Sequence, residues 1–317
     1  MSSIQIQTEK TDYTGGETIR GRVVLSLTEN IPTRGVRIEF YGYEKSYWST
    51  GSGKNRTTHT QTADFYHHEL TLFGHPALSR MELLADAMKG IFTKEHYEFL
   101  GPGEHAFDFE YTLPPNLPAD YSPGDTNYKI AHEVKAYLDI PLSFDVSEAG
   151  EFTIYETYDP WDINPVTARN NKTFMFDMGG GSLELEAAIE RNMYFPGEVV
   201  KGALQIKNDS NRNIKEITVE LNHIVHQKAG SRDTTIEDQY SLLNIPHPTI
   251  RQGLPAQFDL QFRLPEDLYC SITSSELVQV TYELIINADI PWAVDLDVRV
   301  PIRILERAGV PSGVSWD

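Results

Sequence analysis

The most regular feature of the chain is an alternation of apolar and polar residues with a period of two. In the first half, Val36, Ile38 and Phe40 are separated by charged residues, and the same spacing returns at 217–221. Side chains of a β-strand point alternately to its two faces, so this spacing predicts strands with one face in a core and the other in solvent. The pattern therefore predicts an all-β fold.

Two long segments of the chain repeat each other. Tyr13-Thr-Gly-Gly-Glu-Thr-Ile-Arg-Gly returns 181 residues later as Tyr194-Phe-Pro-Gly-Glu-Val-Val-Lys-Gly, with tyrosine, glycine, glutamate and glycine in register. The same shift carries the apolar positions of 36–40 onto those of 217–221. In both copies a glycine-containing turn precedes the first alternating run, as expected where the backbone reverses between paired strands. Each copy is predicted to begin as a β-meander.

A second pair of matching segments lies towards the end of each half. Phe107-Asp-Phe-Glu-Tyr-Thr-Leu-Pro returns 151 residues later as Phe258-Asp-Leu-Gln-Phe-Arg-Leu-Pro, and both runs stop at proline. Further on, Glu133 and Ile140-Pro141 return 150 residues later. The chain is therefore predicted to hold two homologous antiparallel β-sandwiches, with about thirty extra residues inserted between Tyr41 and Phe107 in the first.

The inserted segment contains a predicted helix. Ser79-Arg-Met-Glu82 fits a capping box, in which the hydroxyl and the carboxylate satisfy each other's free N–H groups. Apolar residues follow at helical spacing, namely Met81, Leu84, Met88 and Ile91. We expect this short amphipathic helix to pack against a sheet, the alternatives being a helix that binds a partner or a membrane surface.

The region between the two halves lacks periodicity. The thirteen residues from Asp159 to Asn171 contain two prolines and no alternating run. They predict a linker at 166–180, between an N-terminal domain at 1–165 and a C-terminal domain at 181–317.

A triple glycine, Gly179, Gly180 and Gly181, stands at the end of this linker. Consecutive glycines allow wide backbone freedom, so these residues are candidates for an interdomain hinge. The alternative is a tight surface turn before the strand that begins near Leu183.

Charge narrows the classes of partner. Lys and Arg number 27 and Asp and Glu 46, which gives a formal net charge of −19. A field of this sign repels phosphate backbones and anionic lipid surfaces, so general nucleic-acid binding is disfavoured. Partner segments are expected to be basic, or to pair through their backbone at a sheet edge.

The sequence carries no sign of export or of membrane insertion. No stretch approaches the roughly 18 consecutive apolar residues of a membrane span, and the N-terminus has no basic-then-apolar signal. The only cysteine, Cys270, cannot form an internal disulfide and is expected to be an inert small residue near a strand edge. A soluble, unexported protein is predicted.

Short segments occur in the order found in one protein family. In the first half they are Tyr13-Thr-Gly-Gly-Glu-Thr-Ile-Arg-Gly, Gly35-Val-Arg-Ile-Glu-Phe-Tyr-Gly, Leu113-Pro-Pro-Asn-Leu-Pro and Asp162-Ile-Asn. In the second half they are Gly181-Ser-Leu-Glu-Leu-Glu-Ala, Tyr194-Phe-Pro-Gly-Glu, Ile206-Lys-Asn-Asp-Ser-Asn and Val300-Pro-Ile-Arg-Ile. Together they resemble the arrestin family, in particular its α-arrestin or arrestin-domain-containing branch. The resemblance implies two tandem antiparallel immunoglobulin-like β-sandwiches, with one short helix in the N-terminal domain.

This resemblance also implies a function. Arrestin-like proteins are cytosolic, non-catalytic adaptors that recognise membrane-protein tails or sorting machinery in endocytosis, ubiquitination or signalling, at the endosome or plasma membrane through their partners. The related retromer subunit family shares a similar Gly-[Val/Ile]-Arg-Ile-Glu-Phe segment, so an endosomal coat subunit is an alternative, and bacterial arrestin-like sporulation-control proteins are a third. A hydrolase or ligand-binding enzyme on a β-sandwich would require a pocket with convergent polar groups.

The chain also departs from the α-arrestin pattern. Pro114-Pro115-Asn116-Leu117 has leucine where a Pro-Pro-x-Tyr motif requires tyrosine, so recruitment of a WW-domain ligase by that route is not expected. The sequence ends about a dozen residues after Leu305, which fits either a shortened chain or a minimal family member.

The best candidate for partner contact is the segment from Ser49 to Thr60, between two predicted strands. It is locally basic within an acidic protein, and arrestins carry exposed loops that contact partners at this place. Lys54 and Arg56 are expected to pair with phosphate or carboxylate groups of a partner. The alternative is a solvated hairpin loop without a binding role.

Other chemically suggestive residues are interpreted as structural. His67 and His68, with His75 nearby, cannot converge on one metal ion, because neighbouring residues of a strand point to opposite faces. Glu17 and Glu198 occupy equivalent turns and are expected to bond backbone N–H groups beside them. The sequence predicts no catalytic residue, no metal and no cofactor.

Overall fold

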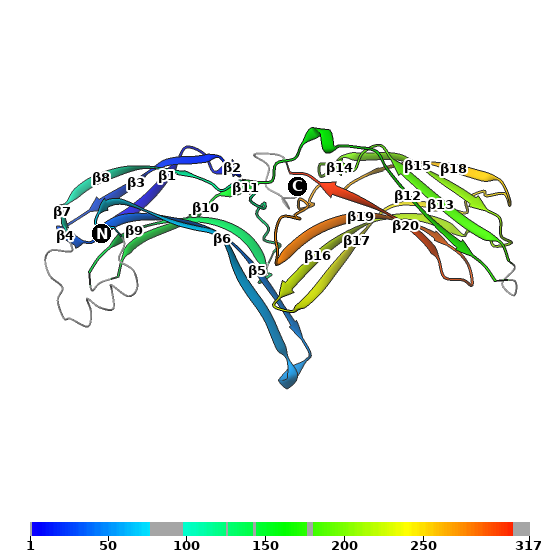
Figure 1. Cartoon of the computed structure of the whole chain (residues 1–317), viewed down its shortest axis with the longest axis horizontal. Coiled ribbons are helices and arrows are strands. Elements are labelled where there is room, and N and C mark those ends of the chain that lie inside the picture. Colours follow the sequence, from blue (N-terminus) through cyan, green and yellow to red (C-terminus); the bar gives the residue numbers. More distant parts are fainter. Residues whose placement is uncertain (1, 77–97, 125, 142–143, 176–179, 307–317) are drawn as a thin grey trace. The chain divides into compact units, whose positions relative to one another are not determined.

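The computed structural model describes residues 2–76, 98–124, 126–141, 144–175 and 180–306. It divides into two compact units. Unit 1 consists of Met1–Lys45 and Thr62–Glu156, and unit 2 consists of Ser46–Gln61 and Thr157–Asp317. The described residues of both are built from β-strands joined by turns and short 3-10 segments (Figure 1), as the alternating pattern predicted.

The strands follow the chain in order. Up to the end of unit 1 the elements are β1 (Ser3–Thr8), β2 (Asp12–Thr14), β3 (Thr18–Leu27), β4 (Ile31–Thr33), β5 (Gly35–Thr50), η1 (Gly53–Asn55), β6 (Thr57–Gly74), β7 (Glu98–Leu100), β8 (Gly103–Thr112), β9 (Lys129–Asp139), β10 (Val146–Glu151) and β11 (Thr153–Tyr155). The remainder are η3 (Pro160–Asp162), β12 (Val166–Thr173), β13 (Ser182–Ile189), β14 (Met193–Tyr194), β15 (Val199–Asn208), β16 (Glu216–Ala229), β17 (Arg232–Pro246), β18 (Pro255–Arg263), β19 (Val278–Asp289) and β20 (Leu296–Ile304).

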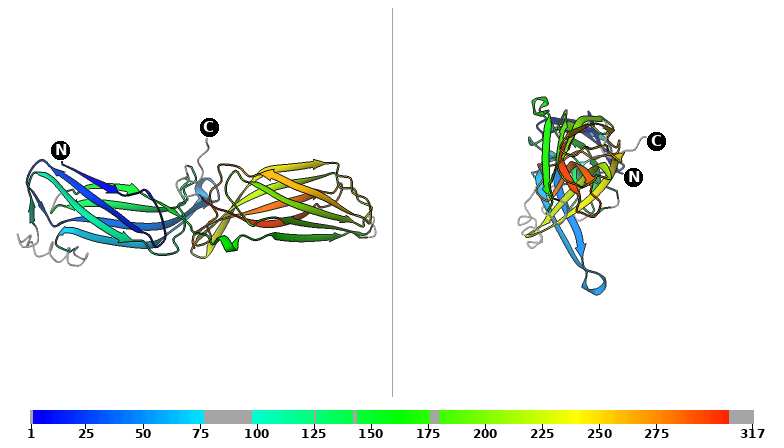
Figure 2. Two further views of the ribbon diagram at one scale, coloured as in Figure 1. Left: turned by 90° about the horizontal axis from the view of Figure 1, so that it is seen from above. Right: turned by 90° about the vertical axis from the view of Figure 1, so that its right-hand side faces the viewer.

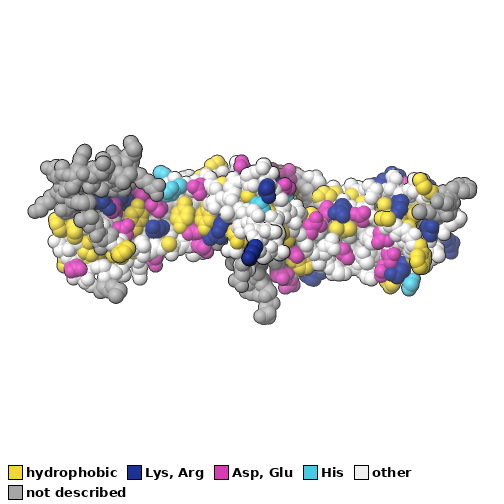
Figure 3. All heavy atoms as spheres, turned by 90° about the horizontal axis from the view of Figure 1, so that it is seen from below, with side chains coloured by type: hydrophobic (Ala, Val, Ile, Leu, Met, Phe, Trp, Pro, Cys, Tyr) yellow, Lys and Arg dark blue, Asp and Glu magenta, His cyan; other side chains and the backbone are white. Residues whose placement is uncertain are grey.

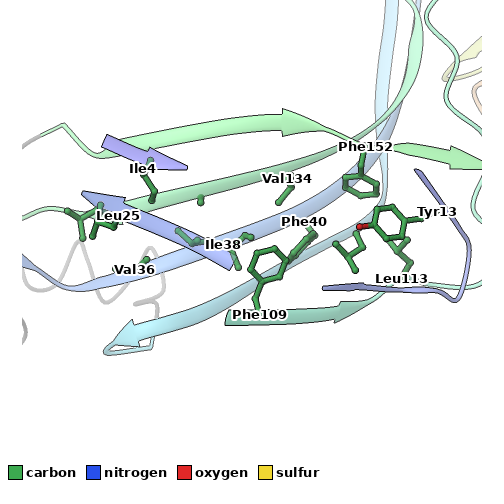
Figure 4. Close-up of a cluster of buried hydrophobic side chains, with 14 of the residues drawn as sticks. Ile4, Tyr13, Leu25, Val36, Ile38, Phe40, Phe109, Leu113, Val134 and Phe152 are labelled. Atoms are coloured by element: carbon green, nitrogen blue, oxygen red, sulfur yellow. The ribbon is translucent and has the colours of Figure 1, made fainter. Parts of the chain in front are cut away.

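Each unit is a sandwich of two sheets. Unit 1 packs the sheet β1-β3-β8 on the sheet β10-β9-β5-β6, and unit 2 packs β12-β13-β15-β18 on β14-β20-β19-β16-β17. The strands of each unit form two layers (Figure 2). In unit 1, Leu25 of one sheet and Ile38 and Phe40 of the other are fully buried in one cluster (Figure 4). The predicted tandem β-sandwiches are confirmed.

The two sandwiches share their strand register. Gly21 on β3 lies opposite Thr8 and Phe109, and Gly202 on β15 occupies the same place 181 residues later. A Cβ atom on Gly21 would lie 2.2 Å from the Gln7 carbonyl oxygen, and the corresponding distance at Gly202 is 2.3 Å. Both repeats therefore need glycine where the neighbouring strand approaches closely.

The repeated turn before β3 and β15 is held by the same contacts. In unit 1 the Glu17 carboxylate accepts from the Thr14 N–H at 2.7 Å and from Lys10 Nζ at 2.9 Å, and these two bonds, led by the one from Lys10, lower the pKa of Glu17. The equivalent distances in unit 2 are 3.1 and 3.2 Å, from Phe195 and Arg191 to Glu198. The structural role predicted for the two glutamates is confirmed.

A short parallel pairing closes each sandwich. β2 pairs with β11 in unit 1, and β14 pairs with the end of β20 in unit 2. The Asp120 carboxylate accepts from the buried Ile154 N–H at 2.6 Å and from the His132 N–H at 3.3 Å. In unit 2 the hydroxyl of Ser271 accepts from the Ile304 N–H at 2.9 Å. Both repeats therefore place a hydrogen-bond acceptor beside the closing strand, although the accepting residue differs.

The extra length of unit 1 lies in two places. The β5–β6 hairpin spans 35–74, whereas the equivalent β16–β17 hairpin spans 216–246 and is nine residues shorter. The remainder falls between β6 and β8, at 75–102, where unit 2 has only 247–254. The helix predicted from Ser79 to Ile91 lies outside the described residues.

The segment predicted as a linker contains a strand. Residues 166–173 form β12, which pairs with β13 along its whole length at the edge of a sheet in unit 2. Because β12 is mostly exposed, it needs few apolar residues and shows no alternation in the sequence. After the hairpin segment 46–61, the chain passes from unit 1 to unit 2 for the last time between Glu156 and Thr157.

The hinge interpretation requires correction for Gly180 and Gly181. Gly180 and Gly181 lie in the turn between β12 and β13, inside unit 2, and Gly179 lies outside the described residues. The Gly180 N–H donates to the Met175 carbonyl at 3.0 Å, and the Phe174 N–H donates to the Gly181 carbonyl at 2.8 Å. A turn between two paired strands of one sheet does not join the two units, so Gly180 and Gly181 belong to a hairpin.

Replacement of Asp120 by alanine is expected to destabilise unit 1 by about 2 kcal/mol, because the buried Ile154 N–H loses its acceptor. Hydrogen exchange of the β9 and β11 amides should accelerate, while β19 and β20 of unit 2 serve as an internal reference. Asp108→Ala is the matched control, since Asp108 is an exposed carboxylate whose removal should leave the stability of unit 1 nearly unchanged. Unchanged exchange in β11 of Asp120→Ala would contradict this role.

Candidate partner-binding surface

Lys54 and Arg56, the residues predicted to contact a partner, lie at the tip of the β5–β6 hairpin (Figure 1). η1 reverses the chain there, and every residue from Thr50 to Thr58 is exposed. Within the described part of the chain, neither side chain forms a hydrogen bond or an ion pair. Both charges are therefore available to an incoming group.

The tip itself is held by long hydrogen bonds. The Asn55 N–H donates to the Ser52 carbonyl at 3.2 Å, and the Arg56 N–H donates to the Gly53 carbonyl at 3.3 Å. Below the tip the hairpin is better fixed, because Thr50 Oγ1 lies 2.9 Å from His59 Nε2 and the Trp48 ring packs 5.1 Å from the His59 ring. The structure thus presents a loosely bonded end on a well-packed stem.

The stem is anchored within unit 2. The hydroxyl of the buried Ser46 donates to the Lys228 carbonyl at 2.5 Å, and the Tyr47 N–H donates to the Gln227 side chain at 3.0 Å. These bonds explain why 46–61 group with unit 2 although β5 and β6 begin and end in unit 1.

The hairpin is a basic segment in an acidic chain. From Lys45 to Ala63 there are three basic residues, Lys45, Lys54 and Arg56, and no acidic residue, which gives a local charge of +3. Elsewhere on the face drawn in Figure 3, basic and acidic side chains are interspersed. The net charge of the hairpin is thus positive, whereas that of the whole chain is negative.

The histidines singled out in the sequence have different neighbours. The His67 ring lies edge-on to Tyr41 of β5, whereas the His68 ring stacks on Tyr111 of β8 with centroids 4.9 Å apart. Among the described residues, no group of three or more His, Cys, Asp or Glu side chains is arranged to hold a metal ion. His75 contributes its carbonyl, which accepts from Arg37 at 3.1 Å.

A cavity of about 570 Å³ lies beside β1, β3 and β8 of unit 1. Its charged side chains pair with one another, Arg22 Nε donating to Asp108 at 2.7 Å and Arg20 Nε lying 3.5 Å from Glu110. The hydrogen bond from Arg22 lowers the pKa of Asp108, whereas a carboxylate that acts as a general acid near neutral pH needs a raised pKa. This cavity therefore gives the enzyme hypothesis no support.

Equivalent loops of the two units expose large apolar side chains that the sequence analysis did not single out. Phe144, between β9 and β10, is 97% exposed, and Trp292 and Val294, between β19 and β20, are 95% and 81% exposed. In both loops an aspartate accepts from the N–H of the isoleucine five residues before it, namely Asp145 from Ile140 and Asp295 from Ile290. Large exposed apolar residues often mark contact sites, so these loops are a second candidate surface.

Comparison with known protein families accounts for both units. The model of the arrestin (or S-antigen) N-terminal domain matches residues 2–160, and the model of the arrestin C-terminal domain matches residues 179–308. The chain belongs to the arrestin family. The resemblance carried by the short sequence motifs is thereby confirmed.

The arrestin's relatives are arrestin domain-containing proteins. Protein A of Dictyostelium discoideum is 24% identical over 313 residues, which cover 95% of this chain and 50% of that protein. Protein C of the same organism is 25% identical over 215 residues, 64% of this chain and 32% of that protein. Human arrestin domain-containing protein 5 is 24% identical over 321 residues, 95% of this chain and 86% of that protein. The chain thus spans half or less of these two Dictyostelium relatives.

Unit 1 of this arrestin buries a histidine that the sequence analysis also missed. His132 on β9 is fully buried, with Nδ1 3.1 Å from the Tyr66 hydroxyl and Nε2 3.0 Å from the Pro118 carbonyl oxygen. Because a carbonyl only accepts, Nε2 carries the proton and Tyr66 donates to Nδ1. Burial lowers the pKa of His132 to about 4. Its position on β9 alternates in phase with Val134 and Ala136, so the period of two could have identified it as inward-facing.

Acidification is expected to destabilise unit 1 through His132. The imidazole titrates near pH 6.5 when unfolded and near 4 when folded, so the unfolded chain binds the proton first. The contribution of His132 is complete above pH 6.5, and about 3 kcal/mol is lost as the pH falls through this window to 4. The measurement is the unfolding free energy of unit 1 against pH.

His132→Gln supplies the comparison, because glutamine does not titrate. Between pH 4 and 6.5 the variant should lose less stability on acidification than the wild type. The slope of the unfolding free energy against pH should be smaller in the variant by up to the amount that corresponds to one bound proton. His223 of unit 2, whose pKa is also lowered by burial, is present in both chains. Identical pH slopes in the two proteins would show that His132 does not titrate in this window.

Proposed function

We propose that this chain is a non-catalytic adaptor of the arrestin type, which binds membrane-protein cytoplasmic tails or subunits of sorting complexes. Membership of the arrestin family supports an adaptor role, since proteins of this family generally act by binding other proteins. Among the described residues, no helix combines the length and the apolar character that a membrane span requires. We place the protein in the cytoplasm, at the endosome or plasma membrane through its partners.

The observation that carries the proposal is the tip of the β5–β6 hairpin. Lys54 and Arg56 are exposed, unpaired within the described chain and separated from acidic residues along the sequence. Guanidinium and ammonium groups in this state bind carboxylate or phosphate through charge-assisted hydrogen bonds. The tip therefore fits an acidic or phosphorylated segment of a partner.

The net charge of the chain favours the opposite kind of partner, so the range of the interaction decides between them. At physiological ionic strength exposed charges act over about 8 Å. A group that touches the tip is thus governed by Lys54 and Arg56 more than by distant carboxylates. Basic partner segments are expected on the acidic surfaces, or at exposed sheet edges such as β17 through backbone pairing.

A retromer-like endosomal coat subunit is the alternative adaptor function. The retromer subunit family shares the fold and the sequence segment near Gly35, but a coat subunit is expected to form a stable complex with other coat subunits. Purification of the chain from cells at physiological salt distinguishes the two, because a coat subunit should co-purify in a fixed ratio with its partners whereas a cargo adaptor should not.

The double variant Lys54→Ala/Arg56→Ala is expected to weaken binding of an acidic or phosphorylated tail peptide by about twofold to thirtyfold. Each exposed charge pair contributes about 0.2–1 kcal/mol, and every 1.4 kcal/mol is tenfold in Kd. Fluorescence anisotropy with labelled peptides of acidic, phosphorylated and basic composition measures the effect. Raising the salt concentration should reduce the difference between wild type and variant.

Lys201→Ala/Arg251→Ala is the matched control. It removes the same charge from two exposed positions of unit 2 and should leave the affinity near that of the wild type. Equal loss of affinity in both double variants would show that the effect comes from net charge alone. No loss in either variant would show that the tip is not part of the contact surface.

A further inference from the structure

The tip of the β5–β6 hairpin also carries hydroxyl groups. Most of those that flank it are engaged, Thr50 with His59, Thr58 with Ser49 at 3.4 Å, and Thr60 with the Ser46 carbonyl at 2.9 Å. The hydroxyls of Ser52 and Thr57 are exposed and form no hydrogen bond within the described chain. These two groups are chemically available.

The charges around Thr57 set it apart from Ser52. Lys54 and Arg56 stand three residues and one residue before Thr57, whereas both follow Ser52. The nearest acidic residue after Thr57 is Asp64, and there is none before it as far back as Glu44. A kinase that selects its acceptor by preceding basic residues offers carboxylates to those positions, so the charge-assisted bonds it needs are present at Thr57.

The backbone at Thr57 suits this use. Arg56 has φ −71° and ψ 126°, and Thr57 opens β6, so the residues around the acceptor are extended. The preceding turn is held by hydrogen bonds of 3.2 and 3.3 Å only. Segments with few buried contacts open locally at low cost in free energy, so the tip can enter a kinase active site without unfolding of either sandwich.

We propose that Thr57 is a phosphorylation site for a serine/threonine kinase that requires basic residues before the acceptor. The Thr57 hydroxyl oxygen attacks the γ-phosphorus of ATP, the bond from that phosphorus to the bridging oxygen breaks, and ADP leaves. The hydroxyl proton passes to a carboxylate of the kinase. The product is phosphothreonine at the basic tip.

Phosphorylation reduces the positive charge of the surface proposed to bind partners, and this consequence rests on the proposed function. A phosphate adds about −1.5 to −2 charges at pH 7, so the local charge of +3 falls to about +1. The new phosphate also competes with a partner's carboxylate or phosphate for Lys54 and Arg56. Modification at Thr57 therefore releases acidic partners from the tip.

The first test uses the full chain with a purified kinase of this specificity and Mg-ATP, followed by mass-spectrometric mapping. Thr57 is expected to be the principal site, and Thr57→Ser should remain a substrate. Lys54→Ala/Arg56→Ala should slow modification about tenfold, the equivalent of one charge-assisted hydrogen bond. Thr60→Val, which removes a bonded hydroxyl, is the control and should leave the rate unchanged.

Three results would overturn the proposal. They are phosphate at Ser52 with Thr57 unmodified, equal rates in wild type and Lys54→Ala/Arg56→Ala, and modification of a free peptide of residues 49–62 but not of the folded chain. Mass is the readout throughout, so these results do not depend on whether any partner binds.

A second test separates this proposal from the proposed function. The phosphorylated chain should bind an acidic tail peptide about tenfold more weakly, whereas Thr57→Val treated with the kinase should bind as the untreated wild type does. If the untreated wild type binds no acidic peptide, the proposed function fails while the phosphorylation site stands. If it binds and phosphorylation changes nothing, the regulatory role is excluded.

Discussion

Burial of one face of every central strand against the opposite sheet is the constraint on which the rest of this structure depends. Each fully buried Val, Leu, Ile or Phe contributes about 1.5–3 kcal/mol, so a slip of one residue in register would exchange a core face for a polar face at great cost. The requirement lapses where β5 and β6 run beyond the core. There the side chains are exposed, so cations and hydroxyls can stand at successive positions without partners in the core.

Polar groups then fix how each sandwich is closed. The carboxylates of Glu17 and Glu198 hold the two repeated turns with the same backbone geometry. At the closing strand the acceptor is a carboxylate in unit 1, Asp120, and a hydroxyl in unit 2, Ser271. The duplication has therefore kept the hydrogen bond and allowed the side chain to change, because a buried N–H without an acceptor destabilises more than the choice of acceptor does.

Alternation and internal repetition in the sequence were sufficient to predict the sheets, the tandem sandwiches and the place of the hairpin tip. β12 was missed because an exposed edge strand has no apolar face to reveal it. The buried state of Arg37 could not be predicted either, since its position is in the polar phase of β5. Arg37 is 4% exposed because Asp139, 102 residues away, accepts from its guanidinium at 2.6 Å. The local sequence pattern does not predict a pair between residues so far apart.

The candidate surface could likewise be predicted only in part. Its location and its basic charge follow from the sequence, but the hydroxyls that are engaged depend on cross-strand pairs such as Thr50 and His59.

The central claim, that the hairpin tip is where an acidic partner binds, is tested most directly by hydrogen exchange of the chain with and without a saturating tail peptide. The account predicts slowed exchange confined to 49–60. Protection elsewhere, with 49–60 unchanged, would contradict it.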